Sequence, residues 1–387
     1  MVEMMSPRPR VLHLFSGWNW VEPACSIVDL CRRLGRHGHV VDLACARAPE
    51  GQPNALEQNA RERHVDPILD FRLEKSFNPF VNLPDIHRLT EFLDREEVQI
   101  VHVHTAHDHY IGSRAARRAN SQPSVVRTNH LGAPLPPTWH NRRVVRGHTD
   151  GWVALAPSCR DEDVRNFELN PARAIAVEAA VDLERFKPAA SRTDVRPAIG
   201  LSSEHVVAGF VSNTGSGRSF ELVMQAFAKA MPAEPLLRLL VIGRGMEPDS
   251  PAQRAARELG IADRAIFAGY RVVDYADYLA AMDFEIFLAP GSDGSCPVAR
   301  EAMAMGKPVI GGRSGLLPEL VEDGRCGLVA DESAAGKLAE AVARLARNRS
   351  LREKLGRAAA AKAKEKFDIE RQAEAIAELY GRLAEGT

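Results

Sequence analysis

The sequence lacks the features that mark membrane-spanning, disulfide-stabilised or nucleic-acid-binding proteins. No window of the 387 residues approaches the run of about 18 apolar residues that a membrane-spanning helix needs. The 50 Lys and Arg residues balance 51 Asp and Glu residues, which gives no general attraction to nucleic acid. The six cysteines contain no Cys-x-x-Cys pair, so a reducing compartment is the simpler interpretation. We therefore expect a cytoplasmic protein that binds no nucleic acid, with peripheral contact at the inner face of the plasma membrane left open.

Strand-like and helix-like segments alternate along the first half of the chain. Short apolar runs are separated by stretches with helical spacing. The expected strands are residues 11–15, 40–45, 99–104, 124–128, 152–155 and 174–177, and the expected helices are 23–37, 84–95 and 111–119. This rhythm is typical of a mostly parallel, doubly wound sheet.

A second series of the same kind follows a linker. Residues 181–200 carry two prolines and mixed charge without apolar periodicity, which marks a domain boundary. Further strands are expected at residues 206–211, 237–242, 265–267 and 286–288, and helices at 218–230, 252–259 and 275–282. We therefore predict an α/β fold of two Rossmann-like, doubly wound domains facing across a cleft, with the domains at 1–185 and 186–368.

The most informative stretch is residues 289–329, APGSDGSCPVAREAMAMGKPVIGGRSGLLPELVEDGRCGLV. A strand ends at Pro290, and a polar loop then leads to a helix that starts at Pro297. Open α/β sheets place ligands at such strand ends, and the amide groups of a helix N-terminus favour a diphosphate. Asp293 lies in the loop and Glu301 in the helix, so both carboxylates are able to accept hydrogen bonds from the hydroxyls of one ligand.

This stretch resembles the retaining family-4 glycosyltransferases of the GT-B fold, whose pattern here is an acidic residue, seven others and Glu, then EAMA-x-G-x-PV. The resemblance implies that Glu301 binds the ribose hydroxyls of a nucleotide-sugar donor and that Asp293 holds the transferred sugar. It also implies that the backbone near Gly294, Ser295 and Cys296 contacts sugar hydroxyls and phosphate.

The stretch departs from the family pattern at two positions. Asp293 stands where the family usually has Glu, so its shorter side chain affects which sugar is accepted. Pro297 lacks an amide group at a position where the family often has one. The segment VDLERFKP at residues 181–188 also resembles the family's interdomain stretch, and the resemblance implies that the last helix, residues 369–387, packs back on the first domain.

A glycine-rich loop after the strand at 206–211 is a second candidate for donor binding. Gly215 and Gly217 permit the backbone to approach an anion closely. The resemblance implies an Arg and a Lys on the diphosphate, at positions that here hold Asn213 and Arg218. Arg218 keeps one cation with a planar fork that suits a diphosphate, although it is also typical of a surface arginine. Gly243 belongs to a Gly-Arg-Gly turn that is similar to one in the family.

The loop after the first strand, Ser-Gly-Trp-Asn-Trp, stands where the family usually has a glycine-rich turn. Only Gly17 remains to accommodate phosphate there. Trp18 and Trp20 are candidates for stacking on an acceptor sugar, because an aromatic face suits the C–H face of a pyranose. Both are equally typical of core aromatics.

Histidines are dense in the sequence VHVHTAHDHY at residues 101–110. His102 and His104 alternate on a strand and share a face, and His107 and Asp108 are expected in the loop beyond, as acceptor contacts or as satisfied loop residues. Closely spaced imidazoles suit zinc, but the resemblance implies an enzyme without metal or other cofactor, and we predict none. It also implies that His130 hydrogen-bonds the transferred sugar and neutralises charge near its anomeric carbon.

Together these features predict a retaining glycosyltransferase that moves a hexose-type sugar from a UDP- or GDP-sugar to a glycan or lipid-linked acceptor in envelope polysaccharide or lipopolysaccharide synthesis. The resemblance implies front-face transfer, in which the leaving diphosphate is stabilised by Arg218 and helix amides. His130, Asp293 and Arg218 are the catalytic candidates. Two alternatives stay open, namely a sugar-nucleotide epimerase or phosphorylase, and a degenerate homologue that binds a sugar nucleotide without turnover.

Overall fold

The structure, a computed structural model, describes residues 8–20, 23–75, 78–188, 193–212, 217–271, 273–289 and 294–385. The chain divides into two compact units. The first unit contains Met1–Ala180, Ser292–Ser295 and Ile369–Thr387, and the second contains Val181–Gly291 and Cys296–Asp368. In the described part of the chain, no helix is long and apolar enough to cross a membrane.

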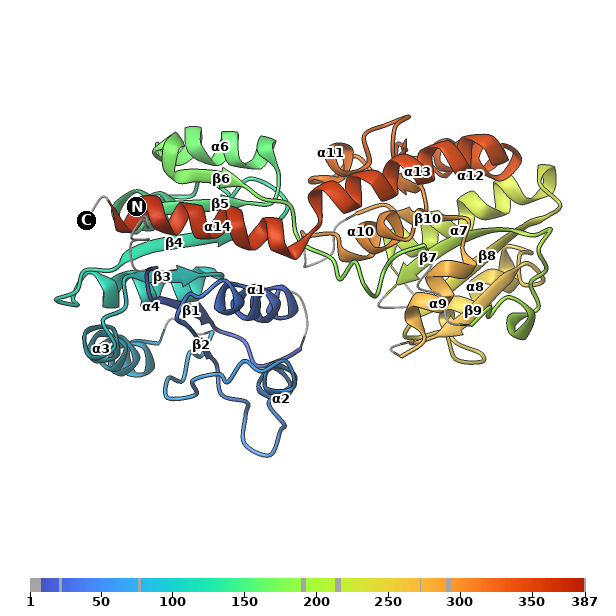
Figure 1. Cartoon of the computed structure of the whole chain (residues 1–387). Helices are drawn as coiled ribbons and strands as arrows, with labels where there is room; N and C mark the ends of the chain where they lie inside the picture. Colours follow the sequence, from blue (N-terminus) through green and yellow to red (C-terminus); the bar gives the residue numbers. More distant parts are fainter. Residues whose placement is uncertain are drawn as a thin grey trace. The chain divides into compact units, whose positions relative to one another are not determined.

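The first unit is built on a six-stranded parallel sheet with the order β2-β1-β3-β4-β5-β6 (Figure 1). Parallel neighbours need a crossover connection, which explains why helices separate these strands along the chain. The strands are β1 (Val11–Phe15), β2 (Val41–Cys45), β3 (Ile100–Val103), β4 (Ser124–Asn129), β5 (Gly151–Ala154) and β6 (Ala174–Ala176).

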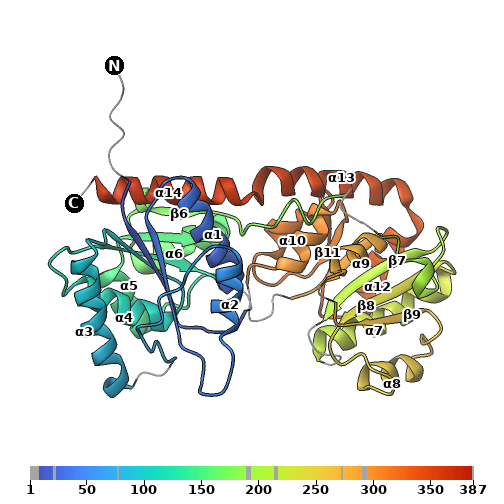
Figure 2. The same cartoon turned by 60° about the horizontal axis from the view of Figure 1, so that its bottom comes forward.

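Helices bury both faces of the first sheet (Figure 2). On one face, α1 (Ala24–Arg36) and α14 (Ile369–Ala384) pack together, and the apolar residues of α14 join a cluster with Val11, Ile100 and Val153. On the other face, α3 (Pro79–Arg95) and α4 (Ala106–Ala116) bury the alternate residues of β1 and β3. The unit also contains α2 (Ala55–Glu62), α5 (Trp139–His148), α6 (Pro157–Phe167) and η1 (Pro171–Arg173).

The second unit contains another six-stranded parallel sheet, with the order β12-β11-β10-β7-β8-β9. Its central strands are apolar on both faces, as expected when helices cover both sides. The strands are β7 (Val206–Ser212), β8 (Leu237–Gly243), β9 (Ala265–Gly269), β10 (Phe284–Phe287), β11 (Val309–Gly311) and β12 (Gly327–Val329).

The main core of the second unit lies between its sheet and the helix pair α7 (Arg218–Ala230) and α12 (Ala335–Arg347). On α7, the buried side chains recur every three to four residues, which turns one stripe of the helix toward the strands. The remaining elements are η2 (Pro197–Ile199), η3 (Met231–Ala233), α8 (Pro251–Glu258), α9 (Tyr275–Ala281), α10 (Pro297–Ala304), α11 (Leu317–Val321) and α13 (Arg349–Lys366).

Most of the predicted elements are confirmed, and the clearest error concerns α4. This helix begins at Ala106 and not near residue 111, so His107 and Asp108 lie in its first turn and the prediction of a loop there is wrong. The cause is a capping box, in which the Thr105 hydroxyl accepts from the Asp108 amide and the Asp108 carboxylate accepts from the Thr105 amide. The sequence pattern also left α2, α5, α6 and β12 without a prediction.

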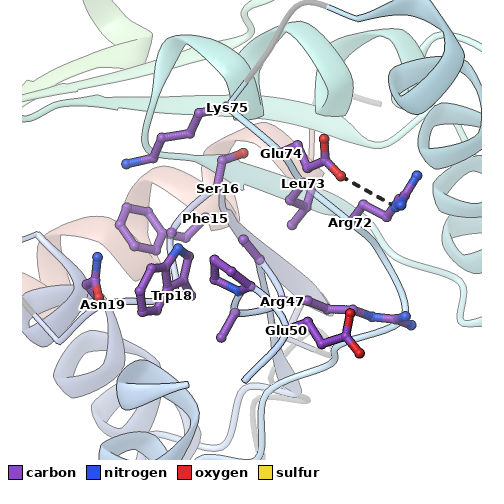
Figure 3. A pocket seen from close by; sticks show the side chains of 14 residues that line it. Phe15, Ser16, Trp18, Asn19, Arg47, Glu50, Arg72, Leu73, Glu74 and Lys75 are labelled. Atoms are coloured by element: carbon purple, nitrogen blue, oxygen red, sulfur yellow. Dashed lines mark ion pairs between the residues drawn. The ribbon is translucent and has the colours of Figure 1, made fainter. Parts of the chain in front are cut away.

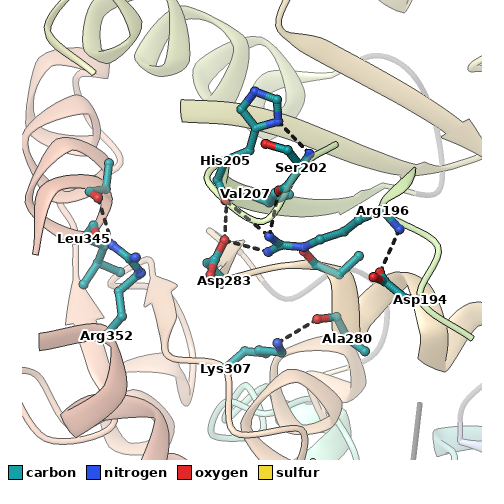
Figure 4. Close-up of polar contacts among 12 residues, drawn as sticks. Asp194, Arg196, Ser202, His205, Val207, Ala280, Asp283, Lys307, Leu345 and Arg352 are labelled. Carbon is teal, nitrogen blue, oxygen red and sulfur yellow. Dashed lines mark hydrogen bonds and ion pairs between the residues drawn. The ribbon is translucent and has the colours of Figure 1, made fainter. Parts of the chain in front are cut away.

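One arginine ties the entry of the second unit to the amino-terminal edge of its sheet (Figure 4). The Arg196 guanidinium donates to the Asp283 carboxylate at 2.9 Å and to the carbonyls of Ala281, Ser202 and His205 at 3.0–3.3 Å. The same Asp283 oxygen accepts from the Val207 amide at 2.7 Å. One side chain therefore fixes the segment before β7, the end of α9 and the start of β10.

Replacement of Arg196 with Ala should destabilise the second unit. The change leaves Asp283 without its cation and two or three carbonyls without donors, at a cost of about 2 kcal/mol, and lowers the melting temperature by roughly 4–8 °C. Scanning calorimetry measures this shift. Arg349→Ala, which removes an exposed pair with Glu353 on α13, is the matched control and should change stability by less than about 0.5 kcal/mol. Equal effects of the two variants would contradict the proposed role of Arg196.

Candidate active site

Each sheet has one point where the strand order reverses, and open α/β sheets bind ligands beyond the carboxyl ends of the strands at such points. In the first unit the reversal lies between β1 and β3, and in the second unit it lies between β7 and β10. Gly17 follows β1 and His104 follows β3, whereas Gly217 and Arg218 follow β7. The predicted site residues therefore gather at the topological switch points of the two sheets.

Glu301 lies in the second turn of α10, and its carboxylate is partly buried. The hydroxyl of Tyr275, at the start of α9, donates to this carboxylate at 3.0 Å. Burial raises the pKa of Glu301 to about 7, although the Tyr275 hydrogen bond and the nearby Arg185 charge act in the opposite direction. The carboxyl group is therefore poised between its neutral and ionised forms near neutral pH, with one oxygen held by a tyrosine.

A second buried carboxyl, which the sequence pattern did not single out, lies beneath this region on β10. Glu285 is fully buried, and one of its oxygens accepts from the Val211 amide at 3.2 Å. Among the described residues, its other oxygen has no hydrogen-bond partner. Burial raises the pKa of Glu285 to about 8, and the Glu301 charge adds to this rise. Glu285 is therefore mostly protonated at neutral pH.

The loop ends near the β7 switch point require glycine. Gly217 has a φ of 99°, and Gly243 has a φ of 146°. A Cβ atom at position 243 would lie 1.6 Å from the Ser212 carbonyl oxygen, so only glycine fits where the end of β8 passes the end of β7. Arg218 begins α7 and is exposed, and it forms no ion pair with the described part of the chain.

Three of the predicted donor-site residues, Asn213, Gly215 and Asp293, lie outside the described residues. The segment that follows Asp293 leads directly into α10. Gly294 and Ser295 form a turn, Ser295 is buried, and Cys296 has a left-handed backbone with a φ of 54° at the N-cap of the helix. The roles of these residues in donor binding stay predictions.

The first unit contains a pocket of about 650 Å³ at the carboxyl ends of β1 and β2 (Figure 3). Gly17 and Trp18 line it, together with Lys75 and the Arg72–Glu74 ion pair. Trp20 does not line this pocket, because its ring packs on the α2 side of the unit with the Arg63 guanidinium 4.6 Å above it. The structure therefore separates the two tryptophans and leaves Trp18 as the candidate for acceptor contact.

His107 and Asp108 are buried inside the unit and hold its loops together. The Asp108 carboxylate accepts from the amides of Ser16 at 2.6 Å, Thr105 at 2.8 Å and His104 at 3.3 Å. His107 contacts the Ser16 hydroxyl at 2.7 Å through Nδ1 and the Asn82 amide oxygen through Nε2. Asp108 has no exposed surface for the acceptor contact expected of it, and its contacts shape the β1 loop instead.

His130 follows β4 and is half-buried, with Nε2 3.0 Å from Nδ1 of His104. Burial and the nearby Arg127 guanidinium lower the pKa of His130 to about 3, so the ring is neutral at physiological pH. A neutral imidazole contributes a hydrogen bond to a ligand and no formal charge. In the free chain His130 is thus a hydrogen-bonding group, and its role beside a substrate stays a prediction.

Among the described residues, His13, His102 and His104 form the one group whose ring nitrogens are close enough for a metal, within 4.8 Å of one another. The His102 and His104 rings stack at 4.5 Å with an interplanar angle of 23°, and His13 stacks on His104 at 5.3 Å with an angle of 16°. A metal needs lone pairs that converge in the ring planes. Here the nitrogens face other partners, with His13 Nδ1 3.0 Å from His104 Nε2 and the two His102 nitrogens 2.5 and 2.7 Å from the Tyr380 and Thr128 hydroxyls, so hydrogen bonds use them.

The structure adds residues that the sequence patterns did not reveal. Tyr275 holds Glu301, and an exposed pair formed by Tyr270 and Arg244 lies at the carboxyl ends of β9 and β8, with the guanidinium 4.7 Å from the ring centre. Their positions directly after apolar strands are a weak signal, because many residues that follow strands have no role at a site.

Solved structures define the class of fold. A glycosyltransferase from Rickettsia africae aligns with a TM-score of 0.82 and 15% identity, over 99% of this chain and 100% of that protein. Anabaena HepE, solved in complex with UDP, aligns with a TM-score of 0.78 and 18% identity, over 96% of this chain and 100% of that protein. At these identities the likeness shows the fold alone, which is the GT-B fold of two Rossmann-like units.

Sequence comparisons show the family. The family model described as Glycosyltransferase Family 4 matches residues 25–185, and Glycosyl transferases group 1 matches residues 205–348. A D-inositol 3-phosphate glycosyltransferase of Actinosynnema mirum is 30% identical over 300 residues, which cover 75% of this chain and 69% of that protein. The chain therefore belongs to the family-4 glycosyltransferases.

Other relatives are matched over a smaller share of their length. The matches to D-inositol 3-phosphate glycosyltransferases of Streptomyces bingchenggensis and Streptomyces scabiei are 28% and 30% identical and cover 62% of this chain. They cover 54% and 55% of those two proteins. The chain thus spans about half the length of these relatives.

Glu285→Gln should remove a pH-dependent loss of stability. In wild type, the unfolded chain ionises Glu285 above about pH 4.5, whereas the folded chain keeps it protonated up to about pH 8. The contribution of this group to the free energy of unfolding is therefore lost as the pH rises through this window. We expect the melting temperature of Glu285→Gln relative to wild type to increase steadily from pH 5 to pH 8.

Thermal melts of both proteins at several pH values test this expectation, with Glu258→Gln as an exposed control on α8. The control should differ from wild type by the same small amount at every pH. A constant difference for Glu285→Gln would show that the group does not titrate in this window.

Proposed function

We propose that the chain is a retaining glycosyltransferase that moves a sugar from a nucleoside-diphosphate sugar to a hydroxyl group of a glycan or lipid-linked acceptor in envelope polysaccharide or lipopolysaccharide synthesis. The observation that carries the proposal is the Glu301 carboxyl group on α10, held by Tyr275 beside the switch point of the second sheet. Membership of the glycosyltransferase family supports the reaction type.

The donor is bound by the second unit in this proposal. The ionised form of Glu301 accepts hydrogen bonds from the two ribose hydroxyls, and the Arg218 guanidinium and the first amides of α7 contact the diphosphate. The Tyr270 ring is 59% exposed, and with the Arg244 guanidinium it offers a flat surface for a nucleobase at the same edge of the sheet. Because the similarly folded HepE was solved with UDP, a UDP-sugar is the first donor to test and a GDP-sugar the second.

The proposed reaction breaks the bond between the sugar C1 and the diphosphate oxygen and forms a bond between C1 and the acceptor oxygen. The acceptor proton passes to an oxygen of the leaving diphosphate. Arg218 stabilises the charge that develops on this leaving group, and Asp293 holds the sugar. We propose that no metal ion or other cofactor takes part and that the configuration at C1 is retained.

The acceptor is bound in the first unit, in the pocket beside Trp18. Lys75 and Trp18 line the same pocket, and Lys75 forms no ion pair within the described part of the chain (Figure 3). Arg72 is paired with Glu74 at 3.5 Å. An unpaired ammonium beside an indole ring suits an acceptor that combines a sugar or polyol ring with an anionic group.

The six free cysteines fit a reducing compartment. We therefore propose that the enzyme acts in the cytoplasm, where it meets a lipid-linked acceptor at the inner face of the plasma membrane.

Glu301→Ala should abolish donor binding and leave the fold intact. Two hydrogen bonds to an ionised carboxylate contribute about 1.5–3 kcal/mol each, so we expect donor affinity to fall by about 100-fold or more. In wild type, affinity should decrease as the pH falls below about 7, because the carboxyl group then takes up a proton. Isothermal titration calorimetry with UDP-, GDP-, ADP- and CMP-sugars measures both effects.

The control for this experiment is Glu258→Ala, which removes an exposed carboxylate on α8. Unchanged affinity in Glu301→Ala would overturn the assignment of the donor site. If the product is an epimerised or phosphorolysed donor and no acceptor is glycosylated, the enzyme is an epimerase or a phosphorylase. Tight donor binding without any turnover would identify a degenerate homologue.

Lys75→Met should weaken the acceptor and spare the donor. Methionine keeps the length of the side chain but removes the charge, so we expect the acceptor KM to rise about tenfold, the effect of one charged hydrogen bond, with an unchanged donor KM. D-inositol 3-phosphate and uncharged glycans are the acceptors to compare. Lys354→Met on α13 is the exposed control, and an equal change for charged and uncharged acceptors would contradict the role of Lys75.

A further inference from the structure

The first unit contains an unbroken series of hydrogen bonds that ends at His130. Its members are Thr128, His102, Tyr380, His13, His104 and His130, which we name the histidine chain. The successive contacts are Thr128 Oγ1 to His102 Nε2 at 2.7 Å, His102 Nδ1 to Tyr380 Oη at 2.5 Å, Tyr380 Oη to His13 Nε2 at 3.3 Å, His13 Nδ1 to His104 Nε2 at 3.0 Å, and His104 Nδ1 to His130 Nε2 at 3.0 Å.

The parallel sheet and the last helix assemble this chain. His13 on β1 pairs in register with His102 on β3, which places their side chains on the same face. Thr128 is on the neighbouring strand β4, and Tyr380 reaches the cluster from α14. Each member except His130 is at most 5% exposed, so solvent has little access to the contacts.

Burial keeps the four imidazoles neutral. It lowers the pKa of His13 and His130 to about 3, and it lowers the pKa values of His102 and His104 well below the ordinary value. The Arg127 guanidinium lowers the pKa values of His104 and His130 further.

The other titratable groups around the chain come from the elements that pack on it. They are Asp108 on α4, which accepts from the backbone of His104, Cys31 on α1, which acts on the Tyr380 hydroxyl, and His39 before β2, whose ring lies edge-on to Tyr380 at 6.4 Å. Burial raises the pKa of Tyr380 well above its ordinary value, so its hydroxyl keeps its proton.

A chain of neutral groups with a hydroxyl at one end and another in its interior has three possible proton arrangements. Each neutral imidazole carries one N–H donor and one acceptor nitrogen, and each hydroxyl carries one proton. Five contacts need one proton each, whereas the six members supply six. The sixth proton is therefore on the outer nitrogen of His130, Nδ1, or on the Thr128 hydroxyl and directed away from the chain, or on the Tyr380 hydroxyl and directed away from the chain while its oxygen accepts from both neighbours.

The two hydroxyl groups decide between these arrangements. Within the described part of the chain, the Thr128 hydroxyl has one hydrogen-bond partner, Nε2 of His102, and the Tyr380 hydroxyl has two, His102 and His13. A buried hydroxyl that only accepts leaves its own proton unpaired, which is costly. Thr128 therefore donates to His102. By the same argument the buried Tyr380 hydroxyl donates its proton to His13, and each following group then donates toward His130.

We propose that the histidine chain holds the ring proton of His130 on Nδ1, so that His130 donates a hydrogen bond to an oxygen atom of the bound substrate. Thr128, His102, Tyr380, His13 and His104 are positioning residues in this arrangement, because they act through His130. The inference rests on the proposed function for the identity of the substrate, a nucleotide sugar. It goes beyond that function in naming the tautomer of His130 and the groups that fix it.

The direction of the chain matters for a ligand rich in oxygen atoms. With the proton on Nδ1, His130 presents a donor to a sugar or phosphate oxygen. In the opposite arrangement Nδ1 would present a lone pair, which repels an unprotonated phosphate oxygen and is able only to accept from a sugar hydroxyl. The tautomer of a histidine is set by the partner of its other ring nitrogen, and here that partner is His104, backed by four further groups.

The proton position is measured directly by NMR on protein that contains 15N-labelled histidine. In the free wild-type enzyme, we expect the His130 Nδ1 signal in the range of a protonated nitrogen and the Nε2 signal in the range of an unprotonated nitrogen. Thr128→Val removes the donor at the far end and should shift His130 toward the Nε2-protonated form. Thr128→Ser keeps the hydroxyl and should restore the wild-type spectrum.

Kinetics supply a second readout. If the hydrogen bond from His130 acts on the reacting group, Thr128→Val should lower kcat about tenfold, which is the effect of about one hydrogen bond. The donor KM should change less than about twofold. Thr128→Ser should recover kcat. Tyr380→Phe interrupts the chain at another member and should act in the same way, which covers the case in which Thr128→Val fails to fold. Thr90→Val on α3 and Tyr278→Phe on α9 are the matched controls, and neither should move the His130 signals.

The two proposals fail in different ways. The role of the histidine chain would be overturned if wild-type His130 is protonated on Nε2, or if the His130 signals are unchanged in both Thr128→Val and Tyr380→Phe. Either result would count even if donor binding depends on Glu301. Loss of melting temperature without a change in the His130 signals would show a merely structural role and would also overturn it. If no donor is bound or transferred while the signals shift as expected, the proposed function fails and the tautomer assignment stands.

Discussion

Parallel strand pairing is the constraint on which the rest of this structure depends. A parallel neighbour is reached only by a crossover, so every strand in both units is followed by a loop at the same edge of its sheet. The order of strands reverses once in each sheet, and the loops on either side of that reversal diverge. This arrangement sets the positions of residues near the proposed sites. Gly17 and His104 follow strands of the first sheet, and Gly217 and Arg218 follow a strand of the second.

Burial is the largest influence on the titratable groups of both units, and it acts in opposite directions on acids and bases. Glu285 and Glu301 gain pKa values near 8 and 7, while His13 and His130 fall to about 3. In each case the neutral form is favoured, because a low-dielectric interior penalises the charged form. Neutral imidazoles are what a directional series of hydrogen bonds requires, since a protonated ring donates from both nitrogens and would break the sequence of donors and acceptors.

The last helix links the fold of the first unit to its site. The apolar residues of α14 complete the core on one face of the sheet, and Tyr380, which is fully buried, turns its hydroxyl to His102 and His13. Tyr380 and His13 are 367 positions apart in the chain. The helix thus stabilises the unit through its apolar stripe and, in our proposal, orients His130 through a single hydroxyl group.

The sequence by itself determined the α/β class, the two series of strands and helices, and the placement of Glu301 in a helix after a strand. These features depend on local periodicity and on Pro and Gly at chain breaks, which act over a few residues. The prediction from the sequence was wrong at the start of α4, although the sequence contains Thr105 and Asp108, which form a capping box there. Glu301 and Arg218 could each be proposed from a motif, because each motif is a local loop followed by a helix, α10 for Glu301 and α7 for Arg218.

Only the tertiary structure decided the environment of these groups. Trp18 and Trp20 are two positions apart, yet one lines a pocket and the other packs beside Arg63. The contact between Tyr275 and Glu301 and the series that joins Tyr380 to His130 unite residues from different strands and helices. No local pattern encodes such contacts or the pKa values that burial imposes, because both depend on which elements the fold brings together and on how completely they exclude water.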